Sequence, residues 1–242
     1  MPQFTYSTHT LPCPRTTPSP PPDLAVIAQK YATARLEALL ASPNAFASTH
    51  AIESIFTPEE WAKKIWREDA VVLVCVARPD FEVGPLDGEW VGCAILRGPL
   101  PAREYALPPE AAAPAAGRDD AETKWQMTGV FVSVAHRGRG IGKMLIQAGK
   151  DYAVAQTQAD PPLSRVRLRV MIHPDNLLVL SLYSKAGFVD AGGRATGQEA
   201  YRTNGDESLF ALKLNSLSEE MKMYWTTARV AIVLEWLGEA RP

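Results

Sequence analysis

Short apolar runs and one alternating segment predict the strands of this chain. Residues 70–77 (AVVLVCVA) are uninterrupted, short and rich in β-branched side chains, which is typical of a buried strand. Residues 164–172 alternate instead, which places Val166, Leu168 and Val170 on one face. The predicted strands are residues 4–9, 70–77, 89–98, 124–134, 164–172 and 208–214.

Apolar residues at helical spacing, with start and stop signals around them, predict the helices. The clearest start is the TPEE segment, where Thr57 is the N-cap, Pro58 is the first helical residue and Glu60 completes a capping box. Gly187 ends another helix, and Phe188 beyond it is placed for the apolar contact of a glycine C-cap. The predicted helices are residues 24–41, 58–66, 141–156, 177–186 and 217–236.

The order of these elements predicts one mixed α+β domain with further segments at both ends. Residues 1–22 combine a short strand with a proline-rich segment, and residues 23–214 form the domain itself. Residues 99–123 are rich in proline and alanine and have no steady period, so we expect a mobile insertion loop between strands. Residues 215–242 are expected to form a helical extension, whose apolar stripe would pack on its own domain or on a second copy in a homodimer.

Composition narrows the class of protein without naming it. Of the 242 residues, 46% are apolar, and the net charge of −2 carries no electrostatic footprint for nucleic acid or an anionic membrane. Cys75 and Cys93 lie in apolar runs, which favours reduced core residues over disulfides. No apolar run is long enough to cross a bilayer, and the first residues do not resemble a signal peptide. We therefore expect a cytoplasmic protein, with a nuclear location left open.

The segment HRGRGIGKML, residues 136–145, has the composition of a phosphate-binding loop. A nucleoside-triphosphate loop would require glycine where Arg137 stands and a hydroxyl where Met144 stands. A dinucleotide fingerprint beginning at Gly138 would require glycine at Lys143. What remains is Arg-x-x-Gly-x-Gly between a strand and a helix. Its converging amides and the positive end of the helix suit a pyrophosphate and need no metal.

This loop and a second motif downstream resemble the GNAT superfamily of N-acetyltransferases. The segment VFVSVAHRGRGIGKMLI, residues 130–146, resembles the acetyl-CoA-binding motif of that family. NLLVLSLYSKAGF, residues 176–188, is similar to its second signature. Residues 42–65 resemble the segment between the first two helices of many small members. The resemblance covers about residues 24–214, in the family's order.

The resemblance implies a fold and a donor site. The fold is a single GNAT-like domain with a twisted, mixed, mainly antiparallel sheet, helices on both faces and a C-terminal helix. The strands at residues 124–134 and 164–172 would splay apart to form the acetyl-CoA cleft, with no metal. Asn176 equally fits a helix cap. The residues implied to bind acetyl-CoA are Phe131, Val132, Val134, Arg137, Gly138, Arg139, Gly140, Ile141, Gly142, Lys143, Asn176 and Tyr183.

The resemblance also implies a catalytic acid but leaves the base open. Tyr183 matches the family's tyrosine that faces the thioester sulfur and protonates the departing thiolate, although without the motif it would be read as a core tyrosine. Many relatives carry a glutamate in the strand before the glycine loop, and this chain has none in the middle of that strand. The candidates are Glu122 at the outer end of the strand, Glu53 and His173, whose alternative is a loop residue. We expect His136 to be an exposed loop residue.

The acceptor is expected to be a small amine. The resemblance implies that residues 42–58 and 99–123 form the acceptor wall, with Phe46, Glu53 and Thr128 as substrate-binding candidates. The prediction is acetyl transfer by direct attack, in a ternary complex, to the primary amine of a small molecule or amino-acid-like metabolite. The alternatives are a protein lysine or N-terminus, or a non-catalytic acyl-CoA-binding module. Three arginines on one strand face are either a basic stripe for an acidic acceptor or a solvated, salt-bridged face: Arg165, Arg167 and Arg169.

Overall fold

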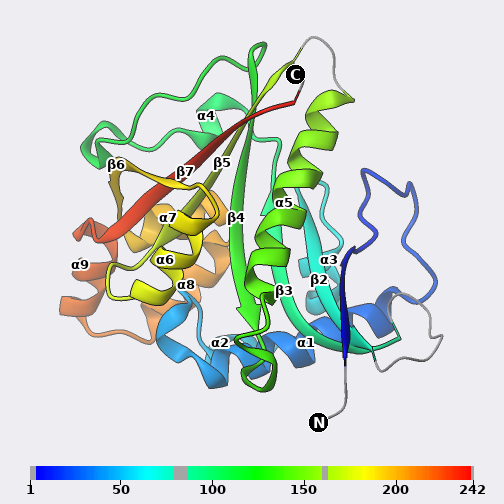
Figure 1. The fold of residues 1–242 in the computed structure, drawn as a ribbon. Helices are drawn as coiled ribbons and strands as arrows, with labels where there is room; N and C mark the ends of the chain where they lie inside the picture. The colour runs from blue at the N-terminus through cyan, green and yellow to red at the C-terminus, as the bar shows by residue number, and fades with distance from the viewer. Residues whose placement is uncertain (1–3, 79–86, 160–162, 241–242) are drawn as a thin grey trace. The chain divides into compact units, whose positions relative to one another are not determined.

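The described strands form one sheet in the order β1-β2-β3-β4-β5-β7-β6 (Figure 1). The structure is a computed structural model, and it describes residues 4–78, 87–159 and 163–240. The strands are β1 (Thr5–Thr10), β2 (Ala70–Arg78), β3 (Glu89–Arg97), β4 (Glu122–Val132), β5 (Arg165–Ile172), β6 (Val189–Ala195) and β7 (Ala231–Glu239). The α-helices are α1 (Leu24–Ala41), α2 (His50–Glu53), α3 (Pro58–Ile65), α4 (Ala102–Tyr105), α5 (Ile141–Gln158), α6 (Leu177–Lys185), α7 (Gly197–Asn204), α8 (Glu207–Asn215) and α9 (Glu219–Thr227). The predicted fold class, a mixed and mainly antiparallel α+β sheet, is confirmed.

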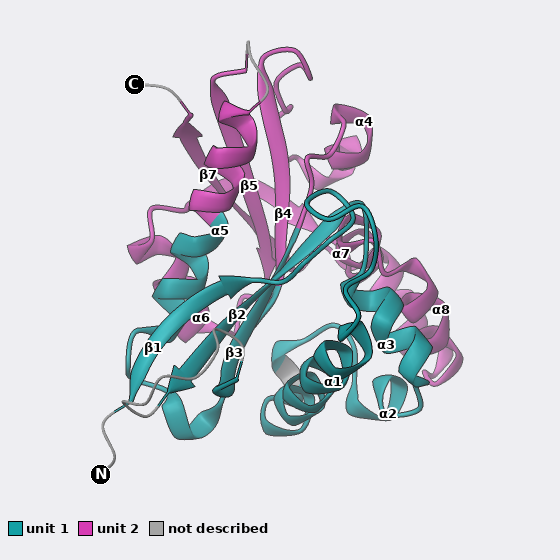
Figure 2. Ribbon diagram, turned by 90° about the vertical axis from the view of Figure 1, so that its right-hand side faces the viewer, with its two compact units in different colours: residues 1–96, 129–149 teal, residues 97–128, 150–242 magenta. Residues whose placement is uncertain are grey.

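The chain divides into two compact units that do not follow its sequence order. Unit 1 comprises residues 1–96 and 129–149, and unit 2 comprises residues 97–128 and 150–242 (Figure 2). Strand β4 and helix α5 each contribute residues to both units. These bounds differ from the division at residues 22 and 214 that the sequence suggests, because segments far apart in the chain build each unit.

Unit 1 is organised around the uninterrupted apolar strand β2. Its even-numbered residues, such as Val72 and Val74, pack in one core with residues of α1, α3 and β3. Tyr31 of α1 belongs to this core. The odd-numbered residues of β2 pack in another core with α5. Because both faces of the strand are covered, polar residues have no place in it, and the alternation usual for a half-buried strand is absent. The predicted capping box at the start of α3 is present: Thr57 accepts from the Glu60 amide and Glu60 accepts from the Thr57 amide.

Unit 2 contains the point at which a parallel strand pair stops. Strand β5 pairs antiparallel with β7 along its full length, and β7 pairs antiparallel with β6. On its other side β5 pairs parallel with β4 from Glu122↔Arg165 to Gln126↔Arg169. The ladder ends there, although β5 continues to Ile172 and β4 continues beyond Gln126. This ending within unit 2 matches the divergence that the sequence resemblance implied.

Several predictions in the C-terminal third were wrong. Residues 208–214, predicted as a strand, lie in helix α8, and the predicted helix over 217–236 stops with α9 before strand β7 begins. Helix α7 and strand β6 were not predicted. Leu209, Phe210 and Lys213 are the buried residues of α8, which is helical spacing rather than alternation.

The insertion at residues 99–123 is also more ordered than its composition suggests. It contains α4 and a short 3-10 turn, and Tyr105 and Ala111 are buried. The Asp119 carboxylate accepts from the Ala102 amide at 2.8 Å and from the Lys124 ammonium at 2.9 Å, so it ties both ends of the segment together. The proline and alanine content of the segment did not indicate these elements and contacts, and its mobility stays a prediction.

Candidate functional site

The glycine loop before α5 leaves a row of backbone amides unpaired. Beyond Arg137, the first amide to make a backbone hydrogen bond is that of Met144, which donates to the Gly140 carbonyl at 3.0 Å. Within the described part of the chain, the amides from Gly138 to Lys143 donate to no other group of the protein. Free amides at the start of a helix, together with the positive end of its dipole, form an anion site.

Backbone conformation explains two of the loop's glycines. Gly138 has a φ of 76° and Gly140 a φ of 81°, in the left-handed region that favours glycine. A Cβ built at either position would meet no atom within 4 Å. Glycine is therefore needed for the turn itself, and the open space leaves the amides accessible to a large anionic ligand.

The basic residues of the loop differ in what they contact. Arg137 donates from Nε to the Val132 carbonyl at 3.2 Å and from Nη2 to Ser42 Oγ at 3.0 Å, which fastens the loop to the end of β4. Arg139 donates to the Tyr6 hydroxyl at 2.7 Å. Lys143 is exposed on the first turn of α5. All three cations therefore lie on the same short segment as the free amides.

The end of β4 bends ahead of this loop. Gly129 has a φ of 63°, in the left-handed region that favours glycine. Phe131 is buried, with its ring centroid 6.4 Å from that of Phe46, while Val134 is 55% exposed in a short turn. The Val132 carbonyl already accepts one hydrogen bond from Arg137. Of Phe131, Val132 and Val134, which the resemblance implies to bind acetyl-CoA, Val134 is the most exposed residue.

His136, predicted to be exposed, is buried, and this prediction was wrong. Its Nδ1 lies 3.1 Å from the Tyr6 hydroxyl, and its Nε2 lies 3.5 Å from the Glu89 carboxylate. Its ring also packs edge-on against Phe4 and Tyr6. Strand β1 covers the histidine from more than 120 residues away in the chain, so no local pattern around His136 could have indicated this.

Helix α6 in unit 2 carries the second motif. Asn176 is its N-cap, and Oδ1 accepts from the Val179 amide at 3.4 Å, as the helix-cap alternative predicted. Tyr183 is buried, and its ring packs edge-on against Phe188 with centroids 5.0 Å apart. Burial raises the pKa of the Tyr183 phenol well above its ordinary value of 10.0. The phenol carries its proton at neutral pH, as it would without this shift, and the shift makes it a weaker proton donor.

The three candidate bases have different surroundings. Glu53 is fully buried and accepts hydrogen bonds from Arg35 at 2.6 and 3.1 Å. Burial alone would raise the pKa of Glu53, but the hydrogen bonds and the charge of Arg35 lower this pKa overall. Glu122 is buried, and its two oxygens accept from Arg167 at 2.8 and 3.3 Å. The His173 side chain is 44% exposed, with Nδ1 3.5 Å from the Asp175 carboxylate. His173 is therefore the candidate whose ring is open to solvent.

The remaining substrate-binding candidates are divided between the units. Phe46 in unit 1 is partly buried against the core, with the Arg35 guanidinium 4.7 Å from its ring centroid. Thr128 in unit 2 is half-buried at the end of its part of β4. Of the three arginines on β5, Arg165 is exposed, whereas Arg167 and Arg169 are drawn into polar contacts. Sequence reasoning missed Tyr105, Gln126 and Glu235 as their partners, because each is remote in the chain.

A mixed sheet whose glycine loop presents free amides at a helix start is suited to bind the phosphates of a cofactor. The chain belongs to the acetyltransferase (GNAT) family, whose model matches residues 45–188, more than half of the chain. The match ends at Phe188, the last residue of the second motif. No curated protein matches the chain.

Solved structures with this fold come from bacteria and plants. A GNAT-family acetyltransferase from Streptococcus pneumoniae is 14% identical with a TM-score of 0.50, and the match covers 97% of this chain and 100% of that one. Arabidopsis thaliana NAA60 in complex with acetyl-CoA is 16% identical with a TM-score of 0.48, covering 97% and 98% of the two chains. At these identities the likeness concerns the fold.

No described helix is long and apolar enough to span a membrane. Among residues 4–78, 87–159 and 163–240, no three His, Cys, Asp or Glu side chains gather in a group that could hold a metal ion.

Proposed function

We propose that the protein transfers an acetyl group from acetyl-CoA to the primary amine of a small molecule or amino-acid-like metabolite, by direct attack in a ternary complex. The observation that carries the donor assignment is the run of unpaired amides from Gly138 to Lys143 at the start of α5. The pyrophosphate of coenzyme A would accept from these amides, while Arg139 and Lys143 offset its charge. The net charge of −2 supports a small acceptor rather than a strongly basic protein tail.

Tyr183 is proposed as the acid of this reaction. The amine nitrogen bonds to the acetyl carbon, the bond between that carbon and the sulfur breaks, and the thiolate takes the phenol proton of Tyr183. The phenolate then regains a proton from solvent. The support for this role is the position of Tyr183 in the second motif, on helix α6.

His173 is proposed as the group that takes the proton lost by the amine. Its ring is exposed at the end of β5, and Asp175 lies close enough to stabilise the imidazolium once the proton arrives. Glu122 and Glu53 are less suited as bases, because each is buried and paired with an arginine through both oxygens. In this proposal they hold segments in place instead.

The test is an acetylation assay that measures free thiol release from acetyl-CoA with a panel of amines. The panel contains small amines, amino acids, a peptide with a free N-terminus and a lysine peptide. Thiol release with small amines at rates above those with either peptide supports the proposal. Faster reaction with a peptide would replace the small acceptor by a protein acceptor. Thermal stabilisation by acetyl-CoA without thiol release from any amine would indicate a non-catalytic acyl-CoA-binding module.

A further inference from the structure

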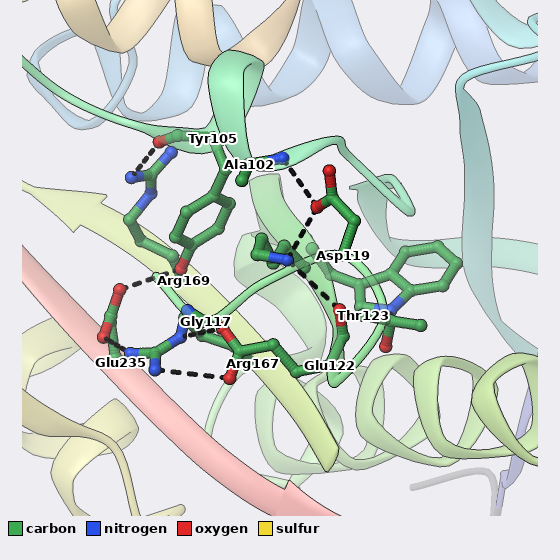
Figure 3. Close-up of polar contacts among 11 residues, drawn as sticks. Ala102, Tyr105, Gly117, Asp119, Glu122, Thr123, Arg167, Arg169 and Glu235 are labelled. Carbon is green, nitrogen blue, oxygen red and sulfur yellow. Dashed lines mark hydrogen bonds and ion pairs between the residues drawn. The ribbon is translucent and has the colours of Figure 1, made fainter. Parts of the chain in front are cut away.

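A buried polar cluster in unit 2 joins the insertion to strands β4, β5 and β7 (Figure 3). Arg167 donates to Glu122 at 2.8 Å and to Glu235 at 2.7 Å. The Tyr105 hydroxyl donates to the other oxygen of Glu235 at 2.9 Å. One arginine thus lies between two carboxylates, so this part of the cluster already holds more negative than positive charge.

Arg169, next but one along β5, has no such partner. Its guanidinium carbon lies 3.8 Å from the centroid of the Tyr105 ring, with Nε donating to Gln126 Oε1 and Nη1 to the Tyr105 carbonyl, both at 2.8 Å. No carboxylate among the described residues lies within ion-pair distance of it. Its Nη2 is buried and hydrogen-bonds to no group in the described chain, although the residue is only 1% exposed. A buried donor without an acceptor is costly, which points to an acceptor that the chain itself does not supply.

A second arginine donates a hydrogen bond to the following backbone carbonyl of the insertion. Arg202 of α7 donates from Nη2 to the Ala106 carbonyl at 2.8 Å, directly after the Tyr105 carbonyl that Arg169 contacts. Burial lowers the pKa of the Arg169 guanidinium, and the nearby Arg202 charge lowers it further, whereas Tyr105 and the Glu235 charge act in the opposite direction. Two like charges are therefore held near each other, and no carboxylate among the described residues is paired with either of them.

Arg202 lines a pocket of about 410 Å³, the size of a small-molecule site. The one acidic residue in the lining is Glu199, whose Oε2 accepts from the Thr196 amide at 3.0 Å and from Arg229 at 2.8 Å. Its charge is thus compensated by Arg229, and Arg202 is the unpaired charge of the wall. The lining residues are Ala106, Leu107, Pro108, Gln198, Glu199 and Arg202.

We propose that Arg202 and Arg169 form a recognition site for a carboxylate, and that the acceptor amine therefore carries a carboxylate group. Arg202 would bind the carboxylate in the pocket wall. Arg169, which contacts the Tyr105 carbonyl directly before the lining residue Ala106, adds a second positive charge nearby. This rests on the proposed function, since it names the class of acceptor. The position of Arg169 links the carboxylate site to the proposed acetyl transfer. Arg169 and Gln126 form the last pair of the parallel ladder before β4 and β5 stop pairing.

The test compares matched acceptors in which only the carboxylate changes, such as alanine and alaninamide, with acetyl-CoA as donor. We expect kcat/KM for the acid to exceed that for the amide by at least about tenfold, since a charged hydrogen bond contributes 1.5–3 kcal/mol. The amine of the amide loses its proton more readily, so intrinsic reactivity favours the opposite order. R202Q is expected to remove most of this preference. R165Q is the matched control, because Arg165 is exposed on the same strand as Arg169.

Succinate, with succinamide as its neutral counterpart, gives a readout that needs no catalysis. Succinate should raise the melting temperature of the wild-type protein and of R165Q, and should do so much less in R202Q. R169M is a second variant, but Arg169 is buried and its loss can unfold the chain. The response of R202Q to succinate is therefore the measurement that tests the carboxylate site.

The two proposals fail in different ways. If no amine is acetylated but succinate still binds through Arg202, the acetyltransferase proposal fails and the carboxylate site is supported. If amines are acetylated while acids and amides react equally, and R202Q leaves both kinetics and succinate binding unchanged, the carboxylate site is overturned.

Discussion

The Lys150 ammonium donates a hydrogen bond to the Ala186 carbonyl at the C-terminus of α6. It also lies 5.3 Å from the centroid of the Phe188 ring, which packs edge-on against Tyr183. The Phe188 amide in turn donates to the Tyr183 carbonyl at 3.0 Å. A cation is favourable at a helix C-terminus. Lys150 therefore fixes the end of the helix that carries the proposed acid.

We expect K150M to lower kcat by roughly tenfold while leaving the KM for acetyl-CoA nearly unchanged, because a displaced acid affects the chemical step more than binding. K150R should restore most of the rate, since it keeps a cation at the helix end. The control is K185M, which removes an exposed lysine of α6. Equal losses in K150M and K185M, or a higher KM with an unchanged kcat, would show that Lys150 does not position Tyr183.

Removal of the Tyr183 hydroxyl tests the acid directly. Y183F should lower kcat on the order of a hundredfold, the lower end of what a general acid contributes. Stabilisation of the protein by acetyl-CoA should persist. Y201F is a matched control, because Tyr201 is likewise buried in unit 2. Because the pKa of Tyr183 is raised, the acid form persists to higher pH, so wild-type kcat should not fall as the pH approaches 10.0, the ordinary value for tyrosine. An unchanged kcat in Y183F would rule out the assignment.

The glycine loop can be tested through its backbone conformation. G138A and G140A each place a side chain in the left-handed region, which costs about 1–2 kcal/mol. Because the loop would relax away from this geometry, we expect acetyl-CoA to bind roughly tenfold more weakly, as measured by calorimetry. G192A is the control, since Gly192 also has a positive φ, 83°, and open space around it but lies in β6. Equal binding by G140A and G192A would mean that the loop is not the pyrophosphate site.

The ion pair between Arg35 and Glu53 predicts a pH-dependent stability. E53Q leaves a buried guanidinium uncompensated, so it should lower the free energy of unfolding by about 3–5 kcal/mol at neutral pH. Because the folded pKa of Glu53 lies below its ordinary value of 4.5, the stabilisation is complete above that pH and is lost as the pH falls through the folded pKa. The difference between wild type and E53Q should therefore shrink in acid. E59Q, at an exposed position in α3, serves as the control in denaturant titrations.

The cysteines should be unreactive in the folded protein. All three are buried and free, and burial raises the pKa of the Cys75 and Cys93 thiols to about 11. Thiolates are the reactive form, so a thiol reagent at pH 8 should label none of them until denaturant is added. Rapid labelling of the native protein would show that these cores open.

The elements that the sequence predicted correctly are those whose structure depends on residues close together in the chain. The run at β2 and the capping box at α3 follow from periodicity and from groups three residues apart, so they could be read from the sequence. The glycine loop could be read as well, because its conformation depends on adjacent residues. Strand β7 could not, since its apolar residues also fit a helical stripe, and only its pairing with β5 makes it a strand.

The polar cluster shows why the contacts of the arginines on β5 could not be predicted from the sequence. Alternation placed Arg165, Arg167 and Arg169 on one face but could not decide what they meet. Arg167 contacts residues 45 and 68 positions away in the chain, and Arg169 contacts Tyr105, 64 positions away. Such pairings depend on the completed topology. The same reason explains why the contacts of the insertion could not be predicted.

The position of β7 has a consequence for how this chain is made. In the sheet β7 lies between β5 and β6, although it is synthesised after both. Until residues 231–239 leave the ribosome, β5 lacks a neighbour on one side and β6 lacks its pairing partner in β7. The nascent protein therefore carries open strand edges, which are templates for aggregation, from the synthesis of β5 until that of β7. These edges are covered only when β7 pairs with both β5 and β6.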